Sequence, residues 1–189
     1  MNRLEHFLCS SSLWRCISQH QLLPWVLSGC QLGDHVLEIG AGYGAATGHL
    51  SQFASRVTSL EYDCRSLGEL RQQHPGGANA AVCGDASRLP FADQSFSSVL
   101  AILVLHHLKS AELQDRAFEE AFRVLHRGGV FLAFEIKGSW VHRVGHIGST
   151  YTPVAPKSAF ARLTKAGFSS VSVTSRTGGF RISALRTSG

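Results

Sequence analysis

The fold is decided by the segment VLEIGAGYG, residues 36–44. Its first four residues form a short, mostly apolar run that ends at Gly40, Gly42 and Gly44. A strand that stops at such a glycine cluster is typical of the first strand-to-helix turn of a doubly wound α/β sheet, because glycine allows a sharp turn and close approach of a ligand to the backbone. Ligands bind these sheets at the carboxyl end of this strand. The segment therefore predicts a ligand site as well as a fold.

Strand-like and helix-like segments alternate after these glycines. Apolar runs bounded by turn residues indicate strands, and longer stretches with helical spacing indicate helices. We expect strands at residues 35–39, 56–61, 79–83, 97–102 and 130–136, and helices at residues 43–54, 63–74 and 111–125. This alternation predicts a parallel sheet with helices on both faces. The nearly unbroken apolar run 99–105 is typical of a strand buried on both sides.

The last part of the chain has a different pattern. Residues 157–166 have helical spacing and are followed by Gly167, a common residue just past a helix end. Residues 168–176 and 180–186 are strand-like, and Thr177-Gly178-Gly179 between them is a good hairpin turn. The expected fold is therefore α/β, with a doubly wound, mostly parallel sheet that finishes in an antiparallel pair.

The length of 189 residues fits one domain spanning residues 1–189. Within residues 1–30, apolar residues recur at helical spacing, with Ser10-Ser11-Ser12 as a candidate N-cap and Pro24 as a helix boundary. We expect this part to form a helical cover. The irregular stretch 137–156 is rich in Gly, Ser and His, and long loops of this kind are often lids or acceptor-binding loops.

The composition excludes several classes of protein. Hydrophobic residues make up 44% of the chain and charged residues 16%, which is ordinary for a globular protein and excludes a disordered one. The net charge is +5, but the basic residues form no run, so nucleic-acid binding is not expected. No stretch approaches the ~20 apolar residues that span a bilayer, and Glu5, His6 and Arg15 interrupt any signal-like segment. These features indicate a cytoplasmic protein.

The cysteines give no sign of a metal site. Cys9, Cys16, Cys30, Cys64 and Cys83 are odd in number, and no CxxC pair or Cys/His cluster has metal-ligand spacing. Reduced thiols without a bound metal are the simplest interpretation.

The charge around the glycine loop bears on its ligand. Gly40, Gly42 and Ala45 also satisfy the dinucleotide pattern GxGxxG/A. However, Glu38 lies two residues before the first glycine, and the loop contains no Lys or Arg. A carboxylate there would repel a pyrophosphate but suit the sulfonium and α-ammonium groups of S-adenosylmethionine. The loop favours this cofactor, and an NAD(P)-dependent oxidoreductase stays open as an alternative.

Two further acids lie where a nucleoside would bind. Glu61 ends the second predicted strand, where a carboxylate can accept hydrogen bonds from both ribose hydroxyls. Asp85 follows the third strand, and together with the backbone amide of Ala86 it could recognise the amino edge of adenine. A solvated acid at a strand end and a simple turn are the respective alternatives.

Together these motifs resemble the class I S-adenosylmethionine-dependent methyltransferases. The resemblance rests on VLEIGAGYG, VTSLEYD, GDASRLPFADQSFSSVL, VLHHL and RVLHRGGVF, which follow in order from residue 36 to 134. It implies a seven-stranded sheet whose last strand is antiparallel. It also implies contacts of the methionine and ribose with Glu38, Gly40, Ala41, Gly42 and Gly44, of the ribose with Glu61, of the adenine with Tyr62, Asp85 and Ala86, and of the methyl-transfer channel with Ile102.

The acceptor is less well defined by the sequence. The segment VTSLEYD is also similar to the ribosomal-RNA adenine dimethylases, but the Asn and Tyr with which those enzymes hold a flipped base are absent from residues 102–107. His106 or His107 could act as a general base, or simply pack at a helix start. His106, His142, His146 and Tyr151 are candidates for an acceptor pocket. Because no inserted domain is available to grip a macromolecule, we expect a small or amphiphilic acceptor.

The sequence leaves other points open. A non-catalytic protein that binds S-adenosylmethionine would carry the same motifs, because no invariant catalytic residue defines the family. The atom that is methylated and the oligomeric state are not specified by any of these residues.

Overall fold

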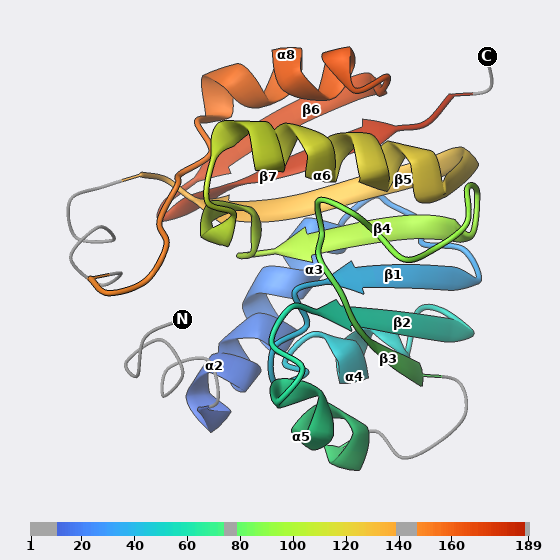
Figure 1. The fold of residues 1–189 in the computed structure, drawn as a ribbon, viewed down its shortest axis with the longest axis vertical. Helices are drawn as coiled ribbons and strands as arrows, with labels where there is room; N and C mark the ends of the chain where they lie inside the picture. Colours follow the sequence, from blue (N-terminus) through green and yellow to red (C-terminus); the bar gives the residue numbers. More distant parts are fainter. Residues whose placement is uncertain (1–10, 74–78, 139–146, 188–189) are drawn as a thin grey trace.

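The computed structural model describes residues 11–73, 79–138 and 147–187, and its strands form one seven-stranded sheet of order β3-β2-β1-β4-β5-β7-β6 (Figure 1). The strands are β1 (His35–Ile39), β2 (Arg56–Glu61), β3 (Asn79–Cys83), β4 (Phe96–Ile102), β5 (Leu125–Ile136), β6 (Ser169–Arg176) and β7 (Gly179–Leu185). The first five strands pair in parallel, and β7 is antiparallel to both of its neighbours. The predicted fold class, strand number and final hairpin are confirmed.

The helices connect and cover these strands. They are α2 (Ser12–Ile17), the π-helix η1 (Ser18–Leu22), α3 (Leu23–Leu27), α4 (Thr47–Leu50), α5 (Ser66–Gln73), the 3-10 turn η2 (Leu105–His107), α6 (Ala111–Val124) and α8 (Pro156–Lys165). Ser11 is the N-cap of α2, as its position in the serine run predicted, and its hydroxyl accepts a hydrogen bond from the Trp14 amide. No helix along these described ranges is both long and apolar enough to cross a membrane.

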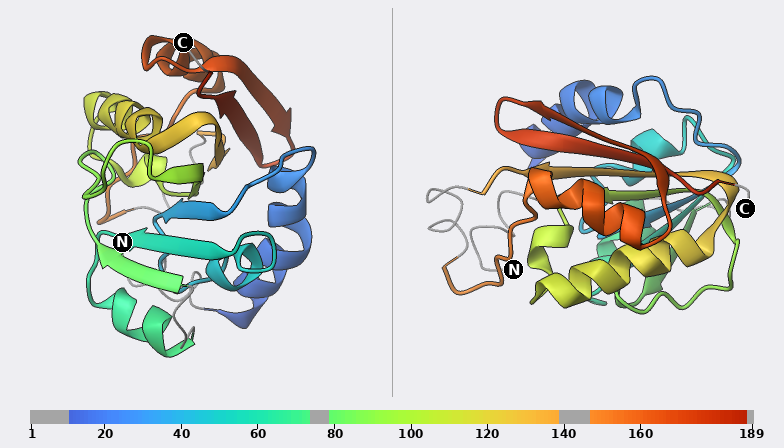
Figure 2. Two further views of the ribbon diagram at one scale, coloured as in Figure 1. Left: turned by 90° about the vertical axis from the view of Figure 1, so that its right-hand side faces the viewer. Right: turned by 90° about the horizontal axis from the view of Figure 1, so that it is seen from above.

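Helices lie on both faces of the sheet, as the two views of Figure 2 make clear. Adjacent strand residues point to opposite faces. In β1, Val36 joins the apolar cluster that includes α3 and α4, whereas Leu37 joins the cluster that includes α6 and α8. Burial on both faces explains why the central strands are apolar without alternation.

Two sequence expectations need correction. The predicted helix 43–54 is reduced to α4, because the chain after β1 makes tight turns in which Gly42 and Gly44 have positive φ angles of 52° and 76°. Cys64 and Cys83 are not reduced thiols but form a disulfide, whose Cα atoms lie 5.2 Å apart. The pairing of β2 with β3 brings the loop after β2 beside the last residue of β3, which explains this bond.

Candidate functional site

A cavity of about 430 Å³ lies at the carboxyl ends of β1, β2, β3 and β4. This volume is in the ordinary range for small-molecule sites. Among the residues proposed to bind the cofactor, those that line the cavity are Glu38, Gly40, Ala41, Gly42, Glu61, Tyr62, Asp85, Ala86 and Ile102. Gly44 is not among the lining residues. These residues are spread over more than sixty positions of the sequence. They meet in one cavity because the sheet places the ends of their strands side by side.

The glycine loop is shaped by backbone hydrogen bonds across the end of the sheet. The amides of Gly40 and Ala41 both donate to the carbonyl of Leu60, at 2.8 and 3.2 Å. A Cβ atom at Gly40 would collide with the side chain of Val104, whereas one at Gly42 would meet no atom within 4 Å. Gly40 therefore permits close packing of the loop after β4, and Gly42 leaves its backbone open to the cavity.

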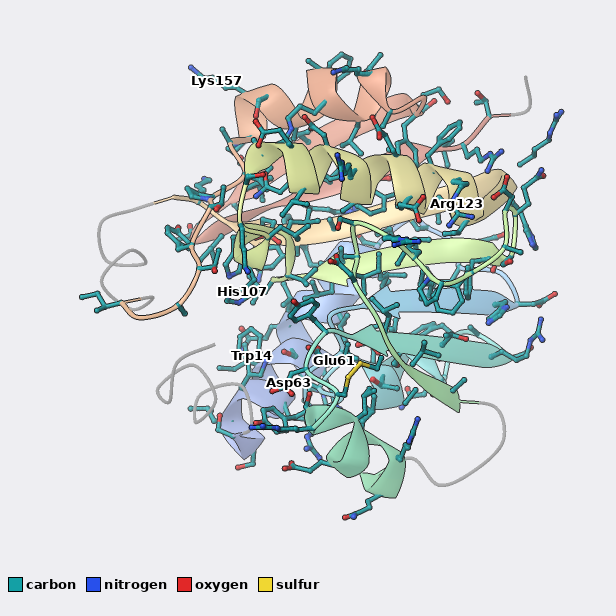
Figure 3. All side chains as sticks on the ribbon, viewed as in Figure 1. Trp14, Glu61, Asp63, His107, Arg123 and Lys157 are labelled. Atoms are coloured by element: carbon teal, nitrogen blue, oxygen red, sulfur yellow. A yellow bond between two sulfur atoms is a disulfide. The ribbon has the colours of Figure 1, made fainter. Side chains whose placement is uncertain are left out.

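Glu61 joins the glycine loop to the loop after β2. Its Oε2 accepts a hydrogen bond from the Gly42 amide at 2.8 Å, and its Oε1 accepts one from the Asp63 amide at 3.0 Å. Figure 3 labels Glu61 and Asp63 together at this end of the sheet. Each carboxylate oxygen has a second lone pair, so the side chain is held in place while it can still accept hydrogen bonds from a ligand.

Glu38 is the buried acid of the cavity, with only 3% of its surface exposed. Its Oε2 accepts hydrogen bonds from the hydroxyls of Thr47, at 2.5 Å, and Ser59, at 2.8 Å. Burial raises the pKa of Glu38, and these two hydrogen bonds offset the effect only in part. A cationic ligand beside this carboxyl would favour its charged form.

The residues proposed for the adenosine lie at the rim of the cavity. Tyr62 is 72% exposed, so its ring is available for stacking. The Oδ1 of Asp85 accepts hydrogen bonds from the amide and the hydroxyl of Ser87, both at 2.8 Å. This turn fixes the direction of the Asp85 carboxylate.

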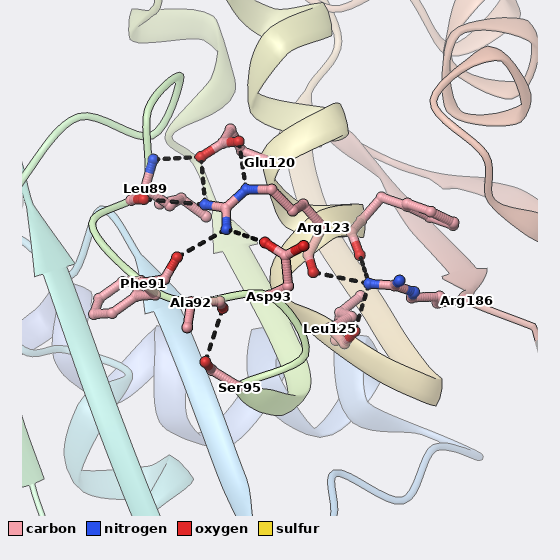
Figure 4. A network of polar contacts seen from close by, with 10 residues as sticks. Leu89, Phe91, Ala92, Asp93, Ser95, Glu120, Arg123, Leu125 and Arg186 are labelled. Atoms are coloured by element: carbon pink, nitrogen blue, oxygen red, sulfur yellow. Dashed lines mark hydrogen bonds and ion pairs between the residues drawn. The ribbon is translucent and has the colours of Figure 1, made fainter.

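The loop that begins at Asp85 is fastened to α6 by Arg123 (Figure 4). The Arg123 guanidinium donates to the carbonyls of Leu89 and Phe91 and pairs with Asp93 and Glu120. The hydrogen bond from Arg123 holds the pKa of the Glu120 carboxyl below its ordinary value. Because the guanidinium satisfies several groups at once, the connection from β3 to β4 is held against the helix.

The rest of the cavity wall is formed by the chain after β4, by residues of the N-terminal helices and by the segment before α8. Leu103 has a positive φ of 55°, and the turn it makes ends β4 and starts the segment leading to η2. The lining residues on this side are mainly apolar, with one serine, one histidine, one lysine and one threonine: Trp14, Ser18, Leu23, Leu103, Val104, His107, Leu108, Lys109, Leu113 and Thr150.

The structure separates the two candidate histidines. His107 lines the cavity, and Figure 3 labels it there. His106 is 3% exposed and is not among the lining residues, in keeping with the alternative that it packs at a helix start. Its Nδ1 lies 2.6 Å from Oε2 of Glu135 instead. Successive residues of a 3-10 turn point about a third of a turn apart, so only one of the two faces the cavity.

Tyr151, another acceptor candidate, is not among the residues that line the cavity. Tyr151 packs edge-on to the ring of His106, with 5.7 Å between ring centroids. His142 and His146 lie outside the residues that the structure describes.

Glu135 is a buried acid that sequence reasoning missed. It is fully buried, and its Oε1 accepts a hydrogen bond from the Leu105 amide at 2.8 Å, while Oε2 pairs with His106. The available signal was an acid in an otherwise apolar run, one residue before the end of β5. Its two partners show that Glu135 anchors η2, the turn that carries His107.

Comparison with known proteins decides the family. The family model described as a methyltransferase domain matches residues 37–133, which is half of the chain. The chain belongs to this family. This is the family of the class I S-adenosylmethionine-dependent methyltransferases.

The names of the relatives that share this domain give different substrates. The mouse protein named "Probable tRNA methyltransferase 9B" is 36% identical over 103 residues, which are 54% of this chain and 22% of that protein. A demethylmenaquinone methyltransferase of Thermobifida fusca is 35% identical over 103 residues, 51% of this chain and 41% of that protein. The match therefore covers less than half the length of either relative.

Solved structures share the fold at low sequence identity. A methyltransferase solved in complex with the Haloferax volcanii Trm112 methyltransferase activator superposes with a TM-score of 0.79. The superposition covers 100% of this chain and 99% of that one, at 16% identity. This likeness concerns the fold alone.

Proposed function

We propose that this chain transfers a methyl group from S-adenosylmethionine to a small or amphiphilic acceptor. One observation carries the proposal: a single cavity is acidic at the ends of β1, β2 and β3 and apolar at the end of β4. The acidic part suits a cationic nucleoside donor, and the apolar part suits an acceptor from which water must be excluded. Membership of the methyltransferase family favours this reading over a nicotinamide-dependent oxidoreductase.

Each residue of the acidic part is assigned to one portion of the S-adenosylmethionine molecule. We assign the ribose hydroxyls to Glu61, the adenine edge to Asp85 and Ala86, and the adenine face to Tyr62. Glu38 and the backbone at Gly40 and Gly42 are assigned to the methionine end, where Glu38 would oppose positive charge. Gly42 has open space where other residues carry a Cβ atom, so a ligand can approach its backbone. The cavity volume of about 430 Å³ suits a small molecule such as S-adenosylmethionine. Gly44 does not line the cavity, and we do not retain it.

When bound, S-adenosylmethionine supplies a methyl group on a positively charged sulfur, which is a good leaving group. The protein must then align an acceptor and exclude water. We propose that Ile102, Leu103 and Val104 form the wall of the transfer channel. His107 is the residue of this side that can accept a proton from a hydroxyl or ammonium acceptor near neutral pH.

The apolar acceptor wall supports a small or amphiphilic acceptor over a nucleic acid. Leu103, Val104, Leu108 and Leu113 offer no hydrogen-bonding side chain to a base. The related mouse protein is named for tRNA and the Thermobifida protein for demethylmenaquinone, so the acceptor class has to be measured rather than transferred.

Two measurements test the proposal. Isothermal titration calorimetry should detect binding of S-adenosylhomocysteine and no binding of NADH. The protein should then be incubated with S-adenosylmethionine labelled in the methyl group and with three separate cell fractions: polar metabolites, lipids and total RNA. We expect label in the metabolite or lipid fraction. Label in RNA alone would contradict the acceptor class, binding without transfer would indicate the non-catalytic alternative, and absence of binding would overturn the whole proposal.

A further inference from the structure

The Cys64–Cys83 disulfide lies at the adenosine end of the cavity, where Figure 3 draws it as a yellow bond beside Glu61 and Asp63. Cys64 directly follows Asp63, and Cys83 lies two residues before Asp85; both of these acids line the cavity. The two sulfur atoms each lie 3.9 Å from the carbonyl oxygen of Tyr62. The bond therefore ties the loop after β2 to the end of β3, from which the loop with Asp85 starts.

The surroundings of the pair allow it to open and close. Both cysteines are exposed, so thiols and disulfides in solution can reach them. Their Cα separation of 5.2 Å is within the usual range for a disulfide. The ends of β2 and β3 beside the cysteines are held independently of the disulfide, because Glu61 pairs with Cys83 in the sheet and the Gly84 amide donates to the Glu61 carbonyl at 3.0 Å.

We propose that Cys64 and Cys83 form a thiol–disulfide exchange site whose oxidation state sets the affinity of the cavity for its cofactor. The site would react with small disulfides and thiols of the glutathione class. In oxidation, one thiolate attacks a small disulfide and releases one small thiol, and the second cysteine then displaces the other. The protein pair loses two electrons and two protons, and the small disulfide becomes two thiols. Two small thiols reverse the reaction.

The oxidised form is the one that binds more tightly. With the disulfide closed, Tyr62 and Asp63 are held beside Asp85 at the cavity. Once it opens, the stronger hydrogen bonds described for the loop are local, such as those from the Asp63 amide to Glu61 and from the Arg65 amide to Asp63, and the Cys83 sulfur has only its 3.9 Å contact with the Tyr62 carbonyl. The ligand must then order the loop itself. Ordering about one side chain on binding corresponds to a loss of affinity of about three- to tenfold.

The test compares two states of the wild-type protein with S-adenosylhomocysteine as the probe. One sample is oxidised with glutathione disulfide and the other is reduced with a phosphine, and calorimetry gives the dissociation constant of each. We expect the reduced protein to bind about three- to tenfold more weakly. Peptide mapping by mass spectrometry should find Cys64 joined to Cys83 in the oxidised sample only.

Variants identify the cysteines responsible. The double variant Cys64→Ser/Cys83→Ser should bind like the reduced protein under both conditions. The control Cys16→Ser, which removes an exposed free thiol, should keep the difference. Equal affinities of the two wild-type samples, a response that persists in the double variant, or a crosslink at other cysteines would each overturn the proposal.

The inference rests on the proposed function only in that the cavity takes an adenosine cofactor, and the experiment separates the two. If neither wild-type sample binds S-adenosylhomocysteine, both proposals fail. If both bind it equally, the exchange site alone fails. The comparison of wild-type samples does not depend on whether the double variant folds, and circular dichroism checks that the reduced protein keeps its secondary structure.

Discussion

His106 and Glu135 form a buried pair, with 2.6 Å between Nδ1 and Oε2. Both side chains are shielded from solvent, so each depends on the other as a polar partner. The pair links β5 to η2, and the carbonyl of His106 also accepts a hydrogen bond from the Thr152 amide at 2.8 Å. Gln114 of α6 donates to the carbonyls of Leu105 and Thr152. The turn η2, which carries the cavity residue His107, is thus attached to the sheet, to α6 and to the chain before α8 through one buried polar network.

Replacing Glu135 tests the importance of this network for stability. Glu135→Ala leaves the Leu105 amide and the His106 ring without their partner in a buried site, and we expect a loss of about 3 kcal/mol or more in the free energy of unfolding. Glu135→Gln keeps an acceptor for Leu105 and should lose roughly 1–2 kcal/mol. Urea denaturation measures both. The exposed control Glu119→Gln should stay within about 0.5 kcal/mol of wild type, and an Ala variant as stable as this control would refute the anchoring role of Glu135.

The two histidines should differ in what their loss affects. His106→Asn should lower the melting temperature, because it disturbs the buried pair. His107→Asn should leave the melting temperature and the affinity for S-adenosylhomocysteine nearly unchanged, and should lower the methyl transfer detected with the labelled donor by about ten- to a hundredfold or more if His107 is the base. Thermal unfolding and the label assay decide between them. The opposite pattern, with transfer lost only in His106→Asn, would contradict the assignment.

The charged form of Glu38 should lower the stability of the fold but favour binding of the cationic donor. Its pKa is raised by burial above the ordinary value of 4.5, so the folded chain holds this proton more tightly than the unfolded chain. Stability is therefore lost as pH rises from about that value through the raised pKa. Glu38→Gln removes this loss. Urea denaturation at increasing pH, from about 4.5 upward, should therefore find that the free energy of unfolding of the variant rises relative to that of the wild type.

The same Glu38→Gln change should weaken binding of the donor. The positive charge of S-adenosylmethionine loses its carboxylate partner, and we expect affinity to fall about tenfold, measured by calorimetry. S-adenosylhomocysteine, which lacks the sulfonium charge, should be affected less. Equal losses for the two ligands would show that Glu38 does not oppose the sulfonium.

Glu61→Ala should weaken cofactor binding most strongly. A charged hydrogen bond contributes ~1.5–3 kcal/mol, so the affinity for S-adenosylhomocysteine should fall roughly ten- to a hundredfold or more. The fold should persist, because Glu61 lies at a strand end and is only half-buried. The control Glu69→Ala changes an exposed acid on α5 and should have no effect. Undiminished affinity in calorimetry would remove Glu61 from the site.

The sequence was sufficient where the pattern is local. The apolar run 35–39 and the glycines after it predict β1 and the turn that follows, because both depend on residues close together in the chain. Cys64 and Cys83 could not be paired from the sequence, since their contact depends on the register between β2 and β3. The environment of Glu135 was also beyond sequence reasoning, because its partners belong to a turn thirty residues earlier.

The contact between Gly40 and Val104 constrains how this scaffold could be redesigned. A Cβ atom at Gly40 would collide with the Val104 side chain, so the turn after β1 and the segment after β4 pack directly against each other only because residue 40 is glycine. A new acceptor specificity engineered by exchanging residues 103–109 would therefore have to keep a side chain no larger than valine at position 104. A bulkier residue would push on the glycine turn, so donor recognition would change along with the intended target.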